Sequence, residues 1–193
     1  MTKLITLIAA LAISFWAAPT ASPSIESAQA ARPEIVEPDL SIHGARRGQA
    51  ATIEWAVERF AQTGLPLPKL SVHVHSASDG CHGERGLFRG GGSTNRIDMC
   101  TDNLFVLLHE IAHAWEVNYA TDEARDAYAD SLGLEVWRSD DVAWGDQASE
   151  RAANSVAWGL MPRTLSPSDA AATQDMIERF TVLTGTEVPR VQS

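Results

Sequence analysis

Hydrophobic and polar residues follow two different periods along the first half of this chain. Apolar residues recur every three or four positions over residues 48–63, which predicts a helix that Gly64 ends. Residues 70–75 alternate instead, with leucine and valine on one side and serine and histidine on the other. This period of two is typical of a half-buried strand, and a second short strand is expected at residues 96–100.

The helical period dominates the second half of the chain. We expect helices at residues 102–119, with Thr101 as the N-cap, at residues 122–132, at residues 146–160, and from about residue 166 to Gly185. A small sheet followed by several helices corresponds to an α+β fold that is mostly helical.

The N-terminal residues have the pattern of an export signal. Lys3 precedes an apolar run over residues 4–18, which has the length of a signal-peptide core and is shorter than the roughly 20 residues that cross a bilayer. The Ala-Gln-Ala sequence that ends at Ala30 has the form that signal peptidase accepts, so we expect a signal peptide at residues 1–30. Cleavage near Ala21 and an uncleaved membrane anchor are the alternatives. The mature protein is then expected to be secreted or to lie in the cell envelope, with no stable membrane insertion.

Residues 31–193 suffice for one compact domain, of which we expect residues 31–40 to be an extended lead-in. The chain has 15 Lys and Arg residues against 25 Asp and Glu residues, and its formal net charge is −10 at pH 7. Negative charge repels phosphate backbones, and no basic stretch with interleaved aromatic residues offsets it. General nucleic-acid binding is therefore excluded as a function.

Cys81 and Cys100 are the only cysteines, and they bracket a glycine-rich segment. In an oxidising compartment such a pair forms a disulfide, and closing a loop of about 20 residues stabilises a protein by roughly 3 kcal/mol. A cysteine-based metal site would need more cysteines at short spacing. We therefore expect a disulfide between Cys81 and Cys100.

The candidate chemistry lies in the sequence HEIAH, which has the H-E-x-x-H pattern. Residues four apart share a face of a helix, so His109 and His113 can both present an imidazole nitrogen to one Zn²⁺ ion. Glu110 lies beside them, where it can accept a proton from a zinc-activated water. The rest of this helix is apolar, so metal binding gives a reason for burying three polar residues. The simpler alternative is that all three lie on a solvated helix face.

A third protein ligand is needed to leave one coordination position open. The glycine and third histidine of the metzincin pattern are absent, because Glu116 and Tyr119 occupy those positions. Glu150 lies near the start of a predicted helix, and Asn154 follows one turn later, where it can orient a ligand histidine. We predict Glu150 as the third ligand. The alternatives are acidic residues closer to the motif, Glu116, Glu123, Asp126 and Asp130.

The sequence HEIAHAW, followed by a helix that carries Glu150 and Asn154, resembles the zincin metallopeptidases of the gluzincin type. The chain also resembles small exported metallopeptidases that have an HE-[LI]-AHAW motif and a late TVLTG-like segment, here residues 181–185. The resemblance implies a zincin-like domain over residues 31–193, a glutamate ligand from the second helix, and hydrolysis of peptide bonds in a peptide or protein substrate. It also implies that the substrate lies along the strand at residues 96–100.

The expected reaction uses a small set of residues. Zinc held by His109, His113 and Glu150 lowers the pKa of its bound water toward about 7, and Glu110 acts as the general base. Four side chains are candidates for stabilising the oxyanion, Tyr119, Tyr128, His73 and His75. Four tryptophans are expected in the core rather than as a platform for substrate, Trp115, Trp137, Trp144 and Trp158.

Two other functions would use the same ligands. A non-catalytic binding module stabilised by zinc needs the two histidines and Glu150, but it has no need of Glu110. The second is a zinc amidase that acts on cell-wall or other non-peptide amides. The presence of Glu110 therefore favours an enzyme over a binding module.

Overall fold

The computed structural model describes residues 39–90, 95–139, 141–162 and 170–189. The predicted signal peptide and the predicted start of the last helix near residue 166 lie outside these ranges. Among the residues described, no helix has both the length and the apolar character needed to cross a membrane.

Four short strands form one sheet in the order β1-β2-β4-β3. The strands are β1 (Leu40–His43), β2 (Leu70–Val74), β3 (Gly86–Arg89) and β4 (Asn95–Met99). β2 pairs in parallel with both β1 and β4, whereas β3 pairs antiparallel with β4 and forms an edge of the sheet. The two predicted strands are therefore the central ones.

The two outer strands were not predicted from the sequence. β1 begins at Leu40, where we expected the end of an extended lead-in, and β3 lies inside the glycine-rich segment. Each outer strand has only four residues, too few for a clear alternation. The predicted disulfide between Cys81 and Cys100 is present, with Cα atoms 6.1 Å apart, and it excludes a cysteine-based metal site. This disulfide closes the loop that contains β3.

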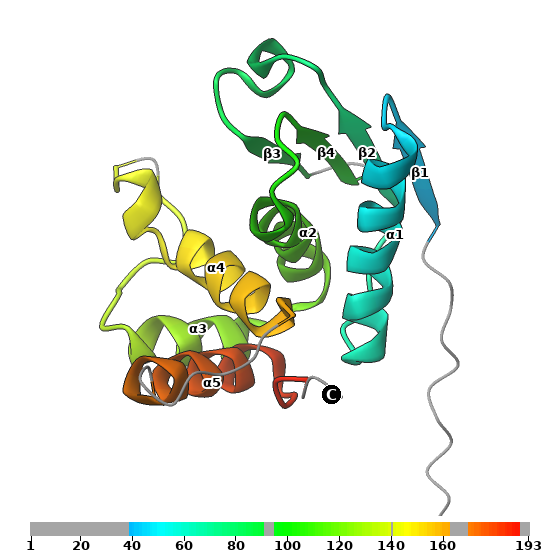
Figure 1. Cartoon of the computed structure of the whole chain (residues 1–193). Helices are drawn as coiled ribbons and strands as arrows, with labels where there is room; N and C mark the ends of the chain where they lie inside the picture. The colour runs from blue at the N-terminus through cyan, green and yellow to red at the C-terminus, as the bar shows by residue number, and fades with distance from the viewer. Residues whose placement is uncertain (1–38, 91–94, 140, 163–169, 190–193) are drawn as a thin grey trace, which may run out of the picture. The chain divides into compact units, whose positions relative to one another are not determined.

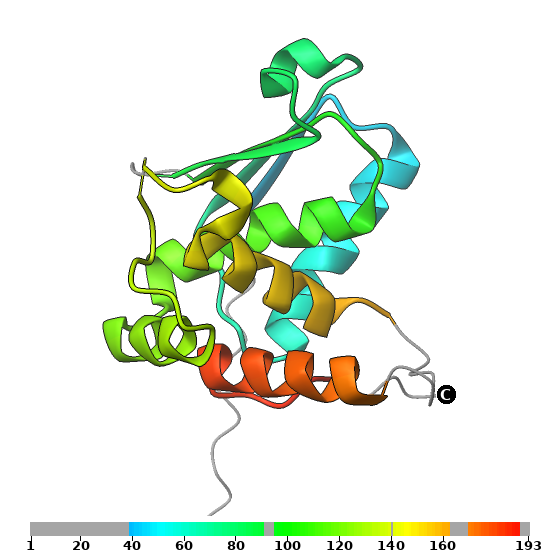
Figure 2. The same cartoon turned by 90° about the vertical axis from the view of Figure 1, so that its left-hand side faces the viewer.

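The helices agree with the predicted ones to within two residues at every end that the structure describes. They are α1 (Arg47–Gln62), α2 (Leu104–Tyr119), α3 (Asp122–Ser131), α4 (Ala148–Leu160) and α5 (Ala170–Thr184). Figures 1 and 2 show that these helices lie on one side of the sheet. The fold is thus α+β with more helix than strand, as predicted.

The start of α2 differs from the prediction. Its N-cap is Asn103, whose side chain accepts a hydrogen bond from the Val106 backbone N–H at 3.1 Å. Thr101, two residues before this N-cap, instead accepts a hydrogen bond from the Asn103 backbone N–H. Both residue types cap helices well, so the sequence alone gave no strong reason to choose between them.

α2 is the central helix of the domain, because it contacts α1, α4, β3 and β4. Leu108, Ile111 and Ala112 have no exposed surface, and they pack in one core with Val72 and Ile97 of the sheet. Since α2 is covered by neighbours on several sides, polar residues on it are also buried. This position sets the environment of the H-E-x-x-H motif.

Candidate metal centre

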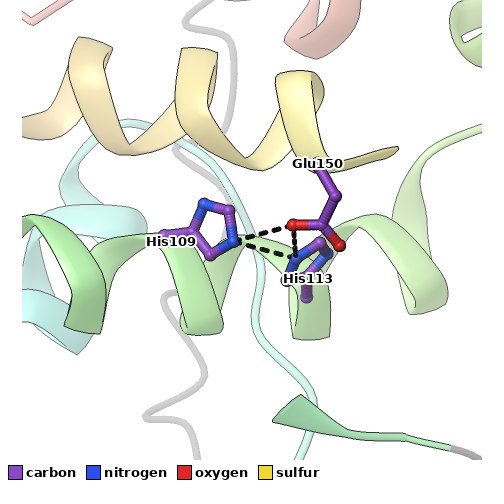
Figure 3. Close-up of side chains that lie close together, drawn as sticks. All are labelled: His109, His113 and Glu150. Atoms are coloured by element: carbon purple, nitrogen blue, oxygen red, sulfur yellow. Dashed lines mark hydrogen bonds and ion pairs between the residues drawn. The ribbon is translucent and has the colours of Figure 1, made fainter. Parts of the chain in front are cut away.

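Helices α2 and α4 bring together three side chains that could hold a metal ion (Figure 3). Glu150 Oε2 lies 3.1 Å from His109 Nε2 and 3.2 Å from His113 Nε2. The two Nε2 atoms are 3.1 Å apart. In the part of the chain that the structure describes, no other group of three His, Cys, Asp or Glu side chains converges in this way.

These three residues are buried, with exposed fractions of 5% for His109, 4% for His113 and 6% for Glu150. Glu110 is also only 6% exposed. The alternative of a solvated helix face is therefore wrong, because α4 and the sheet cover this side of α2. Buried polar groups need compensating interactions, so the cluster requires a physical reason for its existence.

Each histidine is oriented by a hydrogen bond from its Nδ1 atom. His109 Nδ1 donates to Asn154 Oδ1 at 3.0 Å, which agrees with the role predicted for Asn154. His113 Nδ1 donates to Glu116 Oε2 at 3.3 Å. Because both partners are acceptors, each ring carries its hydrogen on Nδ1 and has a lone pair on Nε2 when it is neutral.

Two imidazole lone pairs and one carboxylate oxygen therefore point at the same place. Without a positive charge between them they repel one another, whereas a cation would be attracted by all three. In a tetrahedral site with bonds of about 2.0–2.1 Å, ligand atoms lie about 3.3 Å apart, which is close to the distances found here. The donor set and its geometry thus fit a divalent metal ion.

The electrostatics of the protein alone favour positive charge at the same place. Burial lowers the pKa of His113, but its hydrogen bonds to Glu116 and Glu150 outweigh burial and raise the pKa to about 9. Burial raises the pKa of Glu150, but its interactions with His109 and His113 outweigh burial and lower the pKa to about 2. When no metal is bound, a proton on His113 thus takes the place of the cation.

Glu116 is not a member of the cluster, although it was an alternative for the third ligand. Its carboxylate is 3% exposed and also accepts a hydrogen bond from Trp137 Nε1 at 2.7 Å. Arg125 donates to the Glu116 backbone carbonyl oxygen, and its guanidinium lies 5.9 Å from the centre of the Trp137 ring. No sequence pattern predicted this network, because Trp137 is 21 residues from Glu116. The other three alternative ligands are exposed on α3, Glu123, Asp126 and Asp130.

Glu110 lies between the histidines and the edge strand β3. Its carboxylate is hydrogen-bonded to the backbone of Phe88 in β3. Burial raises the pKa of Glu110, and the neighbouring His109 and His113 only partly oppose this effect. Gly86 in β3 leaves the room for this side chain, because a Cβ atom there would lie 2.7 Å from Glu110 Oε1.

A cavity of about 970 Å³ opens over the cluster. Residues of β3 form one wall, and Arg138, Trp144 and Gln147 from the segment around the start of α4 contribute to another. His109, Glu110, His113 and Glu150 all line it. The buried donor set is therefore within reach of a molecule in the cavity.

The cavity contains a tryptophan that we expected in the core. Trp144 is 64% exposed, and its ring centre is 6.0 Å from that of His109. The prediction was thus wrong for Trp144, whereas Trp115 is buried as expected. Trp144 follows a segment with no helical period, so the sequence offered no burial pattern to separate it from the other tryptophans.

None of the four predicted oxyanion donors lines the cavity. Tyr128 is buried and hydrogen-bonded to Ser155, and Tyr119 is exposed at the end of α2. His73 stacks on His43, and His75 contacts Asp98. The polar groups with N–H donors that do line the cavity include Arg138 and Gln147.

The strand beside the cavity also differs from the expected one. β4 pairs with β2 on one side and with β3 on the other, so its backbone has no open edge. β3 is the edge strand, and all of its residues line the cavity. Residues 95–99 therefore offer no free strand edge for the substrate expected along residues 96–100, and the strand that lines the cavity is β3.

Comparisons with models of known protein families, with curated proteins and with solved structures found no match to this chain. Any functional inference therefore depends on the geometry and chemistry of the site itself.

Proposed function

We propose that this protein is an exported, zinc-dependent metallopeptidase of the gluzincin type. The single observation that carries this proposal is the convergence of His109 Nε2, His113 Nε2 and Glu150 Oε2 beside the carboxylate of Glu110 in an open cavity. Two imidazoles and one carboxylate are a ligand set of catalytic zinc sites, where a fourth position stays open. The disulfide and the apolar run near the N-terminus support export.

When bound, Zn²⁺ supplies a Lewis acid that lowers the pKa of water toward about 7 and polarises a carbonyl group. The protein contributes the proton transfer. Glu110 accepts a proton from the attacking water and delivers it to the nitrogen of the leaving amine. Asn154 and Glu116 hold the two imidazoles in the orientation that the ligand set requires.

The edge strand β3 offers a binding mode for an extended peptide. Its pairing with β4 uses only one side of its backbone, and no strand pairs with the other side, where the Phe88 backbone is hydrogen-bonded to Glu110. A peptide that adds to a sheet edge gains main-chain hydrogen bonds regardless of its sequence. Phe88, which lies with its ring centre 6.1 Å from that of His113, and Trp144 provide apolar surface for side chains of the substrate.

Glu110 separates the proposal from the alternative of a zinc-stabilised binding module. A structural site has no use for a buried carboxylate that lies beside the ligands without being one of them. In Glu110→Gln we expect unchanged zinc binding and a loss of hydrolysis, whereas in Glu150→Ala we expect both to be lost.

The experiment measures zinc stoichiometry and cleavage of a peptide library by the zinc-loaded protein, by both variants and by the matched control Glu123→Gln on the exposed face of α3. A cell-wall preparation is the second substrate. Cleavage of cell-wall amides without cleavage of peptides would replace the proposal with an amidase. Full turnover by Glu110→Gln, or a protein free of metal after incubation with zinc, would exclude it.

A further inference from the structure

Outside the buried cluster, the charged residues that line the cavity are mostly positive, whereas the protein as a whole is negative. Three arginines and three glutamates line it, Arg85, Arg89, Arg138, Glu84, Glu110 and Glu150. Glu110 and Glu150 are the carboxylates of the buried cluster and take part in the proposed reaction. The remaining charged residues are three arginines and one glutamate, on a chain whose formal net charge is −10.

Two of these arginines are available to a ligand. Arg85 and Arg138 are exposed, and neither side chain forms a hydrogen bond or an ion pair with any residue in the described ranges. Arg89 differs, because its Nε donates to the buried Asp98 at 2.9 Å and its charge is thereby offset. Within the described ranges, the charged side chains of the walls that have no partner are thus Arg85, Arg138 and Glu84, which leaves one net positive charge.

The two residues approach the cavity from different elements. Arg85 directly precedes β3, whereas Arg138 belongs to the segment between α3 and α4. A peptide that lies along the open edge of β3 would therefore have a guanidinium available from each of these two elements. Side chains of an extended peptide alternate in direction, so a carboxylate on either side of it can meet one of them.

We propose that the cavity selects peptides that carry a carboxylate, and that Arg138 and Arg85 bind this carboxylate. The inference rests on the proposed function for the statement that the ligand is a peptide. A guanidinium binds a carboxylate through two parallel hydrogen bonds, which are stronger than bonds between neutral groups. Positive cavity walls also attract an acidic ligand to a protein that otherwise repels it.

The test measures binding, so that it does not depend on turnover. Zinc-loaded Glu110→Gln protein is titrated with labelled peptides of equal length that carry Glu, Gln or Lys at one central position, each with a free or an amidated C-terminus. We expect the amidated Glu peptide to bind about tenfold more tightly than the amidated Gln peptide, and the Lys peptide to bind more weakly than both. The preference should decrease at an ionic strength of about 0.5 M.

Variants of Arg85 and Arg138 test whether these two residues cause the preference for the Glu peptide. Adding Arg138→Gln and Arg85→Gln to the Glu110→Gln protein should abolish the preference for the Glu peptide. The control Arg47→Gln, which removes an exposed arginine of α1, should leave this preference unchanged. Since all three side chains are exposed, loss of folding is not expected, and circular dichroism checks this point. Tighter binding of peptides with a free C-terminus than of amidated ones, with no difference between Glu and Gln, would support the inference and identify the terminal carboxylate as the bound group.

Dissociation constants that are the same for Glu and Gln peptides and also the same for free and amidated C-termini, or a preference that survives loss of both arginines, would overturn the inference. Its failure is distinguishable from failure of the proposed function. Preferential binding of acidic peptides that the unaltered protein does not cleave would leave the inference standing and exclude the peptidase. Cleavage of peptides without any preference for a carboxylate would support the peptidase and overturn the inference.

Discussion

His113 Nδ1 lies 3.3 Å from Glu116 Oε2, three residues farther along the same helix, and this contact fixes the ring with Nε2 toward Glu150. Glu116 is held in turn by Trp137. Glu116, which was a candidate metal ligand, therefore orients the predicted ligand His113 instead.

We expect Glu116→Gln to weaken zinc binding by about 10- to 100-fold, because His113 loses the charged acceptor that orients it and raises its basicity. Competition with a chromophoric chelator measures the affinity. Glu123→Gln, an exposed change of the same kind on α3, is the control and should bind zinc normally. Equal affinities in the two variants would show that Glu116 has no such role.

We expect Gly86→Ala to reduce kcat by at least about tenfold while zinc content stays unchanged, because misplacing a reacting group by a fraction of an ångström is costly. The added Cβ would lie 2.7 Å from Glu110 Oε1 and 2.8 Å from Val106 Cγ1, so Glu110 must move. Steady-state kinetics and metal analysis of the same sample measure both quantities. Gly48→Ala is the control, since a Cβ there meets nothing within 4 Å. A normal kcat for Gly86→Ala would contradict the position assigned to Glu110.

Loss of metal should destabilise the folded protein. The folded protein then loses a bound ligand, and a ligand at 1,000 times its Kd stabilises the folded state by about 4 kcal/mol. Thermal unfolding with zinc and with a chelator measures the difference in Tm. In Glu150→Ala the shift should largely disappear. A chelator that leaves Tm unchanged in the unaltered protein would exclude a metal bound to the folded state.

A second charged cluster, centred on Asp98 of β4, should make stability depend on pH. Burial raises the pKa of Asp98, but hydrogen bonds from Arg96, His75 and Arg89 outweigh burial and hold the pKa well below its usual range. Ionised Asp98 therefore stabilises the fold above its unfolded-state pKa of about 4, and this contribution is lost as the pH falls toward the lower folded-state value.

Asp98→Asn should consequently lower the free energy of unfolding by about 2 kcal/mol at pH 7, and the difference from the unaltered protein should shrink below about pH 4. Urea titrations at several pH values measure it. Asp102→Asn serves as the control, because Asp102 pairs with Arg46 at an exposed position and should cost at most about 1 kcal/mol. A difference that is constant from pH 7 to about pH 3 would contradict the role of Asp98.

Reduction of the disulfide between Cys81 and Cys100 should release β3 before the rest of the fold. The cysteines are 19 residues apart, and a crosslink of this length stabilises by roughly 3 kcal/mol. We expect faster amide exchange in β3 and lower activity under mild reduction, at temperatures where the helices stay folded. Exchange that accelerates equally in β3 and α2 would show that the disulfide acts on the whole domain.

The sequence by itself determined the features that depend on neighbours along the chain. The helical period gave the five helices, and the spacing of four residues put His109 and His113 on one face of α2. The same reasoning placed Asn154 one turn after Glu150, where it meets His109. Local backbone geometry fixes such relationships whatever the rest of the chain does.

Only the tertiary structure decided which acidic residue meets the two histidines. Glu150 is 41 residues from His109, and it joins the cluster because α4 packs against α2, while Glu116 turns toward Trp137 and the acids of α3 stay exposed. The tertiary structure also placed β3 at an edge of the sheet and left Trp144 exposed beside the cavity. Contacts between distant segments depend on how complementary surfaces pack together, and no spacing along the chain encodes that information.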